Sequence, residues 1–140
     1  MRAVTLKTEY MQNPCGIDIL KPRLSWLCED GLRQTAYEIH ACCGDRELWN
    51  SGRIESGKMY AFPEAALTSR ERVEWRVRLW DENGDVGPWS EDASFEMGLL
   101  EQGDYSARWI NPELECDPSV HKPASYLRKR FTVPAGFGRG

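Results

Sequence analysis

The stretch RVEWRVRLW, residues 72–80, constrains the fold of this chain more than any other. Between its charged positions the apolar residues recur at every second place: Val73, Trp75, Val77 and Leu79. Successive side chains of a β-strand point to opposite faces of the sheet, so this alternation predicts a strand with one buried face. Since one strand cannot bury that face by itself, the chain must supply a second layer.

Other stretches share this short, alternating character and are separated by turn residues. Together with residues 73–81, we predict strands at 3–9, 23–28, 34–43, 47–53, 58–62 and 89–97. The best helix candidate, residues 64–75, has no single apolar face and leads directly into a strand. The pattern therefore predicts an all-β fold: two antiparallel sheets packed face to face as a β-sandwich, followed by a partly irregular C-terminal tail.

A length of 140 residues leaves room for one ordinary domain and the beginning of a second. We expect the sandwich to occupy residues 1–98. Residues 99–125 are rich in Pro, Asp, Ser and Glu and are expected to be a linker. The stretch YLRKRFTV alternates like a new strand, but a single strand cannot bury its own face, so we expect residues 126–140 to be disordered here or to dock on the sandwich.

Residues 81–92 allow two interpretations. The oxygen-bearing side chains are spaced like calcium ligands: Asp81, Asn83, Asp85 and Asp92. However, the sixth position is Val86, where a helix-flanked calcium loop needs Gly, and the twelfth is Asp rather than Glu. Asn-Gly between two alternating stretches is typical of a β-hairpin. We therefore predict a hairpin loop, and no metal or cofactor site.

The tryptophans are the candidate contact residues. On the outer face of the hairpin, Trp89 is expected to lie between Arg76 and Arg78 as a cation-π stack. The alternative is that Trp89 or Trp80 stacks on a sugar ring. Trp80, Trp89 and Trp109 are thus the candidate carbohydrate or interface contacts, and Trp49 would join them in a row of exposed aromatics.

No catalytic residue is expected in this chain. Glu71, Glu74 and the acidic side chains of residues 81–92 are predicted to be solvated, whereas a catalytic acid with a raised pKa needs an apolar pocket. His40 is predicted to face outward from its strand, and His121 has no partner at ligand spacing.

Charge and apolar runs exclude further classes of function. The net charge is -4, and the basic cluster at residues 128–130 is too short for a nucleic-acid footprint. Apolar runs are far shorter than the roughly 18 residues that span a bilayer, and the N-terminus has no secretory apolar region. The five cysteines form no Cys-x-x-Cys pair and are expected to be free thiols. We expect a soluble, cytoplasmic protein without nucleic-acid or membrane partners.

The last two predicted strands resemble those of fibronectin type III domains, with Arg76 and Arg78 on the outer face and Gly-Pro-Trp-Ser at residues 87–90. This resemblance implies that the sandwich is a fibronectin type III or immunoglobulin-like antiparallel β-sandwich. Further motifs run along the whole chain: NPCGID (13–18), KPRLSWLC (21–28), RQTAYEIHA (33–41), LWNSGRI (48–54), WRVRLWD (75–81), WSEDASFEMGLL (89–100), ARWI (107–110) and PASYLRKRF (123–131). Together and in this order, they resemble the N-terminal region of bacterial α-L-rhamnosidases. The last two motifs are similar to the entry into the next β-sandwich of those enzymes, which implies that residues 126–140 are the truncated first strand of a second β-sandwich domain. Cys15 stands where Leu is usual and Cys28 where Gln is common.

The resemblance implies a role without chemistry of its own. Such enzymes are inverting glycosidases in which one carboxylate protonates the leaving oxygen and another activates water. The family carries both on a helical barrel further along its chain, so neither is transferred to a position here. The implied function is a non-catalytic accessory domain whose partners are the remaining domains of the enzyme. The alternatives are a free-standing carbohydrate-binding module and a protein-interaction module, including a homodimer through edge strands.

Overall fold

The computed structural model describes residues 1–110, 119, 121, 124 and 126–136. The chain divides into two compact units, Met1–Ser106 and Ala107–Gly140. The first unit contains β1 (Arg2–Thr8), β2 (Cys15–Ile17), β3 (Leu24–Glu29), β4 (Ala36–Cys43), β5 (Arg46–Asn50), β6 (Ile54–Glu55), β7 (Tyr60–Ala61), β8 (Arg72–Trp80), β9 (Ala93–Met97) and a short 3-10 turn, η1 (Gln102–Asp104).

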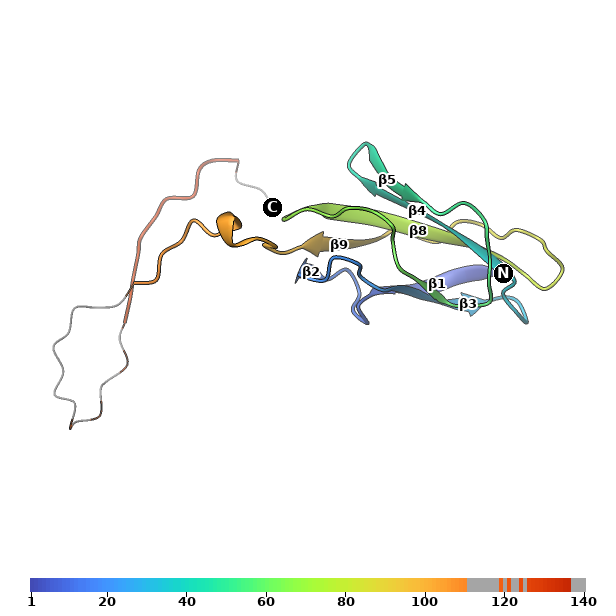
Figure 1. The fold of residues 1–140 in the computed structure, drawn as a ribbon, viewed down its shortest axis with the longest axis horizontal. Helices are drawn as coiled ribbons and strands as arrows, with labels where there is room; N and C mark the ends of the chain where they lie inside the picture. The colour runs from blue at the N-terminus through green and yellow to red at the C-terminus, as the bar shows by residue number, and fades with distance from the viewer. Residues whose placement is uncertain (111–118, 120, 122–123, 125, 137–140) are drawn as a thin grey trace. The chain divides into compact units, whose positions relative to one another are not determined.

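The strands form two sheets that pack face to face (Figure 1). One sheet has the order β1-β3-β7, and the other follows the path β2-β9-β8-β4-β5, with β6 also pairing with β4. All strand pairs are antiparallel except β2 with β9, which is parallel. The predicted β-sandwich is therefore confirmed. All seven predicted strands correspond to observed ones, whereas the short strands β2 and β6 were not predicted.

The core lies between the sheets and consists of the alternating residues that the sequence indicated. Val73, Trp75, Val77 and Leu79 of β8 are all at most 2% exposed. Leu24 and Trp26 of β3 face them from the other sheet, while Ile39 and Ala41 lie beside them on β4; all are buried. Burying a large apolar side chain contributes about 1.5–3 kcal/mol, so this double row supplies much of the stability of the sandwich.

The loop after β8 is a hairpin loop, as predicted, although its turn differs from the simplest Asn-Gly form. The Gly84 amide donates to the Asp81 carbonyl at 3.1 Å, and only Gly84 has a positive φ, of 84°. A turn followed by a left-handed glycine is the three-residue hairpin pattern. The Asp81 carboxylate stabilises it by accepting from the amides of Asn83 (2.9 Å) and Asp85 (3.0 Å).

Strand β9 begins four residues later than predicted because the hairpin ladder is irregular at residues 87–92. Trp80 pairs with Val86 at the loop, but Trp75 pairs with Ala93, so the register slips by two residues between these points. Ser90 bridges the slip: its amide donates to the Val77 carbonyl (2.9 Å), and its hydroxyl accepts from the Val77 amide (3.1 Å). The Ser90 hydroxyl thus takes the place of a backbone carbonyl as the acceptor for the Val77 amide. Residues 89–92 are left outside the strand.

Within the second unit, the described residues contain neither helix nor strand. Those at 126–136 are all exposed. A lone strand has no neighbour to satisfy its backbone or bury its face. The assignment of residues 126–140 as the truncated first strand of a second β-sandwich domain stays a prediction. Most of the expected linker after residue 110 lies outside the described residues, and the division into 1–98, 99–125 and 126–140 stays a prediction.

Candidate functional site

The outer face of the larger sheet carries a continuous stack of arginines and tryptophans. The Trp89 ring has the Arg78 guanidinium 4.7 Å and the Arg76 guanidinium 5.1 Å from its centre. The stack continues to Trp80, which has Arg78 at 5.4 Å and Arg53 at 4.9 Å. The predicted position of Trp89 between Arg76 and Arg78 is confirmed. We call these five residues the arginine-tryptophan stack.

Acidic side chains from β4 and β5 hold the stack in place. Glu38 lies opposite Arg78 across the β4–β8 pair and bonds its guanidinium at 2.6 and 2.8 Å. His40 faces outward, as predicted, and contacts Glu47 at 2.7 Å with its ring centre 6.5 Å from that of Trp89. Cation-π contacts at partly exposed sites contribute about 0.5–1 kcal/mol each, so the stack braces the sheet.

The four tryptophans that a sugar-binding row would need do not form one. Trp80 is 8% exposed, and Trp49 and Trp89 are half-buried. Trp109 is fully exposed but belongs to the second unit. Since guanidinium groups already lie over the Trp80 and Trp89 rings, this arrangement favours the structural stack over sugar stacking. The contact roles of Trp80, Trp89 and Trp109 stay predictions.

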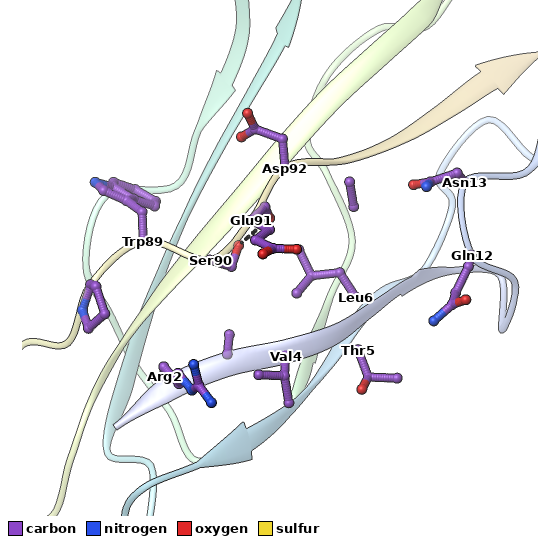
Figure 2. Close-up of a pocket in the computed structure, with 13 residues that line it drawn as sticks. Arg2, Val4, Thr5, Leu6, Gln12, Asn13, Trp89, Ser90, Glu91 and Asp92 are labelled. Atoms are coloured by element: carbon purple, nitrogen blue, oxygen red, sulfur yellow. Dashed lines mark hydrogen bonds between the residues drawn. The ribbon is translucent and has the colours of Figure 1, made fainter.

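A cavity of about 510 Å³ lies between β1 and residues 88–93. Figure 2 shows Leu6 pointing from β1 into it, Gln12 and Asn13 at one side, and Trp89 at the other. Two of its polar groups are already engaged: the Asn13 side chain accepts from the Ser94 amide (2.8 Å), and the Ser90 hydroxyl donates to the Glu91 carbonyl (2.8 Å). The remaining lining holds no histidine or cysteine.

Glu71 departs from expectation, because it is buried rather than solvated. Only 4% of its side chain is exposed, and its carboxylate accepts from the Thr68 amide (2.9 Å) and forms an ion pair with Arg46. Its backbone carbonyl also accepts from the Met97 amide (2.9 Å). The sequence suggested exposure because Glu71 is adjacent to a strand with charged outer positions. Its fixed partners indicate a structural carboxylate.

Beside Glu71, a second group of hydrogen bonds holds the chain that leaves β9. The Ser69 hydroxyl donates to the Asp104 carboxylate and accepts from the Leu100 amide (2.9 Å). Asp104 also accepts from the Glu101 amide (2.9 Å). We call Ser69, Glu71, Leu100 and Asp104 the exit cluster. It fixes residues 98–104 on the sandwich.

Two described carboxylates, Asp104 and Glu82, have a shifted pKa, and in both the shift is downward. The Ser69 hydroxyl, together with the Glu101 amide, lowers the pKa of Asp104. The backbone amide of Glu82 itself, followed by those of Arg33 and Leu32, lowers the pKa of the Glu82 carboxylate. A catalytic acid needs the opposite shift. In the described parts of the chain, no group of three or more His, Cys, Asp or Glu side chains is placed to hold a metal ion.

The four described cysteines are free, and burial raises the pKa of the Cys28 thiol. Cys116 lies outside the described residues.

Of the residues that the structure describes, none belongs to a helix with the length and hydrophobicity needed to cross a bilayer.

Comparison with known proteins agrees with the fold. The chain is 38% identical over 142 aligned residues to the α-L-rhamnosidase of Alteromonas sp., covering 89% of this chain and 15% of that protein. It is 35% identical over 121 residues to the α-L-rhamnosidase of Streptomyces avermitilis, covering 79% of this chain and 12% of that one. The chain thus spans only about an eighth to a seventh of the curated relatives that it matches.

A solved structure described as α-L-rhamnosidase from Dictyoglumus thermophilum superimposes with a TM-score of 0.74 at 27% identity, over 81% of this chain and 14% of that one. Residues 3–101 match the family described as "Rha78A-like, N-terminal immunoglobulin domain". The match includes both sheets and the arginine-tryptophan stack. It also includes Ser69, Glu71 and Leu100 of the exit cluster, but not Asp104. The chain therefore belongs to the family of Rha78A-like N-terminal immunoglobulin domains.

Proposed function

We propose that this chain is the non-catalytic N-terminal accessory domain of an α-L-rhamnosidase, a glycoside hydrolase that releases terminal α-L-rhamnose from glycosides. The observation that carries the proposal is the family match over residues 3–101, within relatives that bear this name. The acid and base of the reaction would belong to another part of the parent protein.

The proposed contribution of the domain is mechanical. The arginine-tryptophan stack stiffens the larger sheet, and the exit cluster holds the chain after β9 through bonds from Ser69 and Asp104. A brace of this kind transmits the orientation of one domain to the polypeptide that follows it. The remaining domains of the parent enzyme are accordingly the proposed partners.

The reading frame downstream of Gly140 tests the proposal. We expect it to continue in the source genome into a long domain that hydrolyses aryl α-L-rhamnosides. A continuation into an unrelated enzyme would overturn the rhamnosidase assignment while leaving the immunoglobulin family intact. A stop codon at this point would instead favour a free-standing module, for which a sugar titration followed by Trp fluorescence is the direct assay.

Two further expectations remain proposals. A homodimer through edge strands is tested by sedimentation of the 140-residue chain at rising concentration. A cytoplasmic location is supported by the odd number of cysteines and by the free thiols of the four that are described, since disulfides persist in oxidising compartments. Cell fractionation with an antibody against this domain would test it.

A further inference from the structure

On the outer face of the smaller sheet, the cations around Tyr60 form no ion pair with a described carboxylate, whereas Arg2 at the far end of β1 pairs with Glu29 and Asp30. The β1–β3 and β3–β7 registers place Lys7, Ser25 and Tyr60 side by side, with Leu27 next along β3. Arg23 and Lys58 flank Tyr60, at 4.7 and 5.8 Å from its ring centre. We call the following set the basic aromatic face: Lys7, Tyr10, Arg23, Leu27, Lys58, Met59, Tyr60 and Phe62.

Apolar groups of this face are unusually open to solvent. Tyr10 is 71% exposed, Leu27 53%, Phe62 50% and Met59 44%. A hollow of about 450 Å³ lies among Lys7, Leu27, Met59 and Tyr60. Contiguous exposed apolar groups mark interaction surfaces, and tyrosine and arginine are enriched where protein interfaces bind most strongly.

The charges of the face indicate the kind of partner. Lys7, Arg23 and Lys58 have no ion pair with any described residue, although the chain as a whole has a net charge of -4. The neighbouring carboxylate, Glu9, accepts from the Arg23 backbone amide (2.5 Å). A surface with carboxylates around an apolar centre would complement these three cations.

Backbone strain is stored at the edge of the same face. Thr8 and Met11 close a tight turn through two hydrogen bonds of 2.9 Å, and the two residues between them, Glu9 (φ 48°) and Tyr10 (φ 68°), both have left-handed backbones. Asn and Gly are the usual residues there, since a left-handed backbone costs other residues about 1–2 kcal/mol. The turn presents Tyr10 against Arg23, 5.0 Å from the ring centre. Strain of this kind is typical of functional positions.

We propose that the basic aromatic face is the surface through which this domain docks onto an acidic, apolar-centred protein surface in a following domain of its parent protein. This inference rests on the proposed function, because it requires a parent protein with further domains. A second copy of this chain is disfavoured as the occupant, because a two-fold interface would bring Lys7, Arg23 and Lys58 against themselves. A sugar is disfavoured because the Tyr60 ring is already covered by Arg23 and Lys58.

Amine footprinting tests the proposal. The 140-residue chain and the full protein encoded by the continuous reading frame are acetylated under identical conditions, and modification of each lysine is followed by mass spectrometry. Lys7 and Lys58 should react about tenfold more slowly in the full protein, as expected when the face is covered about nine-tenths of the time. Lys21, which is exposed and outside the face, is the internal control.

Two matched variants separate docking from folding. Leu27→Asp, on the face, should restore fast acetylation of Lys7 and Lys58 in the full protein without unfolding the 140-residue chain, because Leu27 is 53% exposed. Leu32→Asp, at a site 91% exposed and off the face, should leave the protection intact.

The outcomes also distinguish the two proposals. Rhamnoside hydrolysis by a full protein whose Lys7 and Lys58 react as in the short chain would overturn the docking surface and leave the proposed function standing. Protection without rhamnoside hydrolysis would support the surface and overturn the function. Protection that appears only at high concentration of the 140-residue chain alone would identify a second copy as the occupant and overturn the inference.

Discussion

The guanidinium of Arg78 lies 4.7 Å from the centre of the Trp89 ring, while the same guanidinium bonds the Glu38 carboxylate at 2.6 Å. Arg78 therefore joins β8, β4 and the segment before β9 at one point. This relationship makes the outer face of the larger sheet a brace, and it leads to the first prediction.

Trp89→Ala removes a half-buried ring together with its contacts to Arg76 and Arg78. We expect the free energy of unfolding to fall by about 1–3 kcal/mol, the sum of lost burial and two cation-π contacts. Urea denaturation of the 140-residue chain measures it. Trp109→Ala, at a fully exposed ring, should change stability by less than about 0.5 kcal/mol; equal effects would contradict the brace.

Glu71→Ala removes the buried carboxylate of the exit cluster and leaves the Thr68 amide without its acceptor. An unsatisfied buried donor costs about 1–3 kcal/mol, and we expect a loss of that size. The matched control is Glu74→Ala, three residues along, whose side chain is 60% exposed and which should change stability by less than about 0.5 kcal/mol. Thermal unfolding of both variants gives the comparison.

Asp104 should titrate below its ordinary pKa of 3.8, because the Ser69 hydroxyl and then the Glu101 amide stabilise its charged form. A carboxyl group whose folded pKa is depressed contributes stability that is present above its unfolded pKa and is lost as the pH falls through the folded pKa. The exit cluster should thus loosen in acid, below pH 3.8.

Carbon-13 NMR of the Asp104 carboxyl group tests this titration. Ser69→Ala removes the first cause of the shift and should move the midpoint up towards 3.8. A midpoint at or above that value in the unmodified chain would contradict the hydrogen bonding described here.

Gln34→Leu should be among the more damaging substitutions. The buried Gln34 amide accepts from the Trp26 indole (2.9 Å) and donates to the carbonyls of Ser56 and Lys58 (2.9 Å each). Leu has a similar size but leaves all three groups unpaired, at a cost of about 2–4 kcal/mol. Gln12→Leu, at an exposed position, is the control. If Gln34→Leu lowers the free energy of unfolding no more than Gln12→Leu does, water takes over the hydrogen bonds of the Gln34 side-chain amide.

Alternation was sufficient to predict the strands that form the core. Trp75 and Val77 repeat at the period of a strand, and their burial follows because half of each strand must leave water. Trp89 was also placed correctly, but through the resemblance to fibronectin type III strands and not through alternation, because the ladder at Trp75–Ala93, extended to residue 89, would put Trp89 on the buried face. The bonds between Ser90 and Val77 interrupt that ladder and leave Trp89 on the outer face.

Features that depend on distant segments were missed. Strand β2 has three residues and pairs in parallel with β9, some eighty residues away, so no local period marks it. Glu71 and Gln34 are polar and were not recognised as buried, because Arg46 and Ser56, which bind their side chains, are more than twenty residues away along the chain. The basic aromatic face likewise combines Arg23 with Tyr10 and Tyr60, which only the sheet register brings together. The strained turn at residues 9–10 carries no glycine to signal it.

We propose that this family member is an accessory domain of a rhamnose-releasing enzyme. The most direct measurement is hydrolysis of p-nitrophenyl α-L-rhamnoside by the 140-residue chain and by the full product of its reading frame, at equal concentration. We predict hydrolysis by the full product and a rate equal to the buffer blank for the 140-residue chain. Hydrolysis by the short chain, or a full product that is active on another glycoside and inert on this one, would contradict the account.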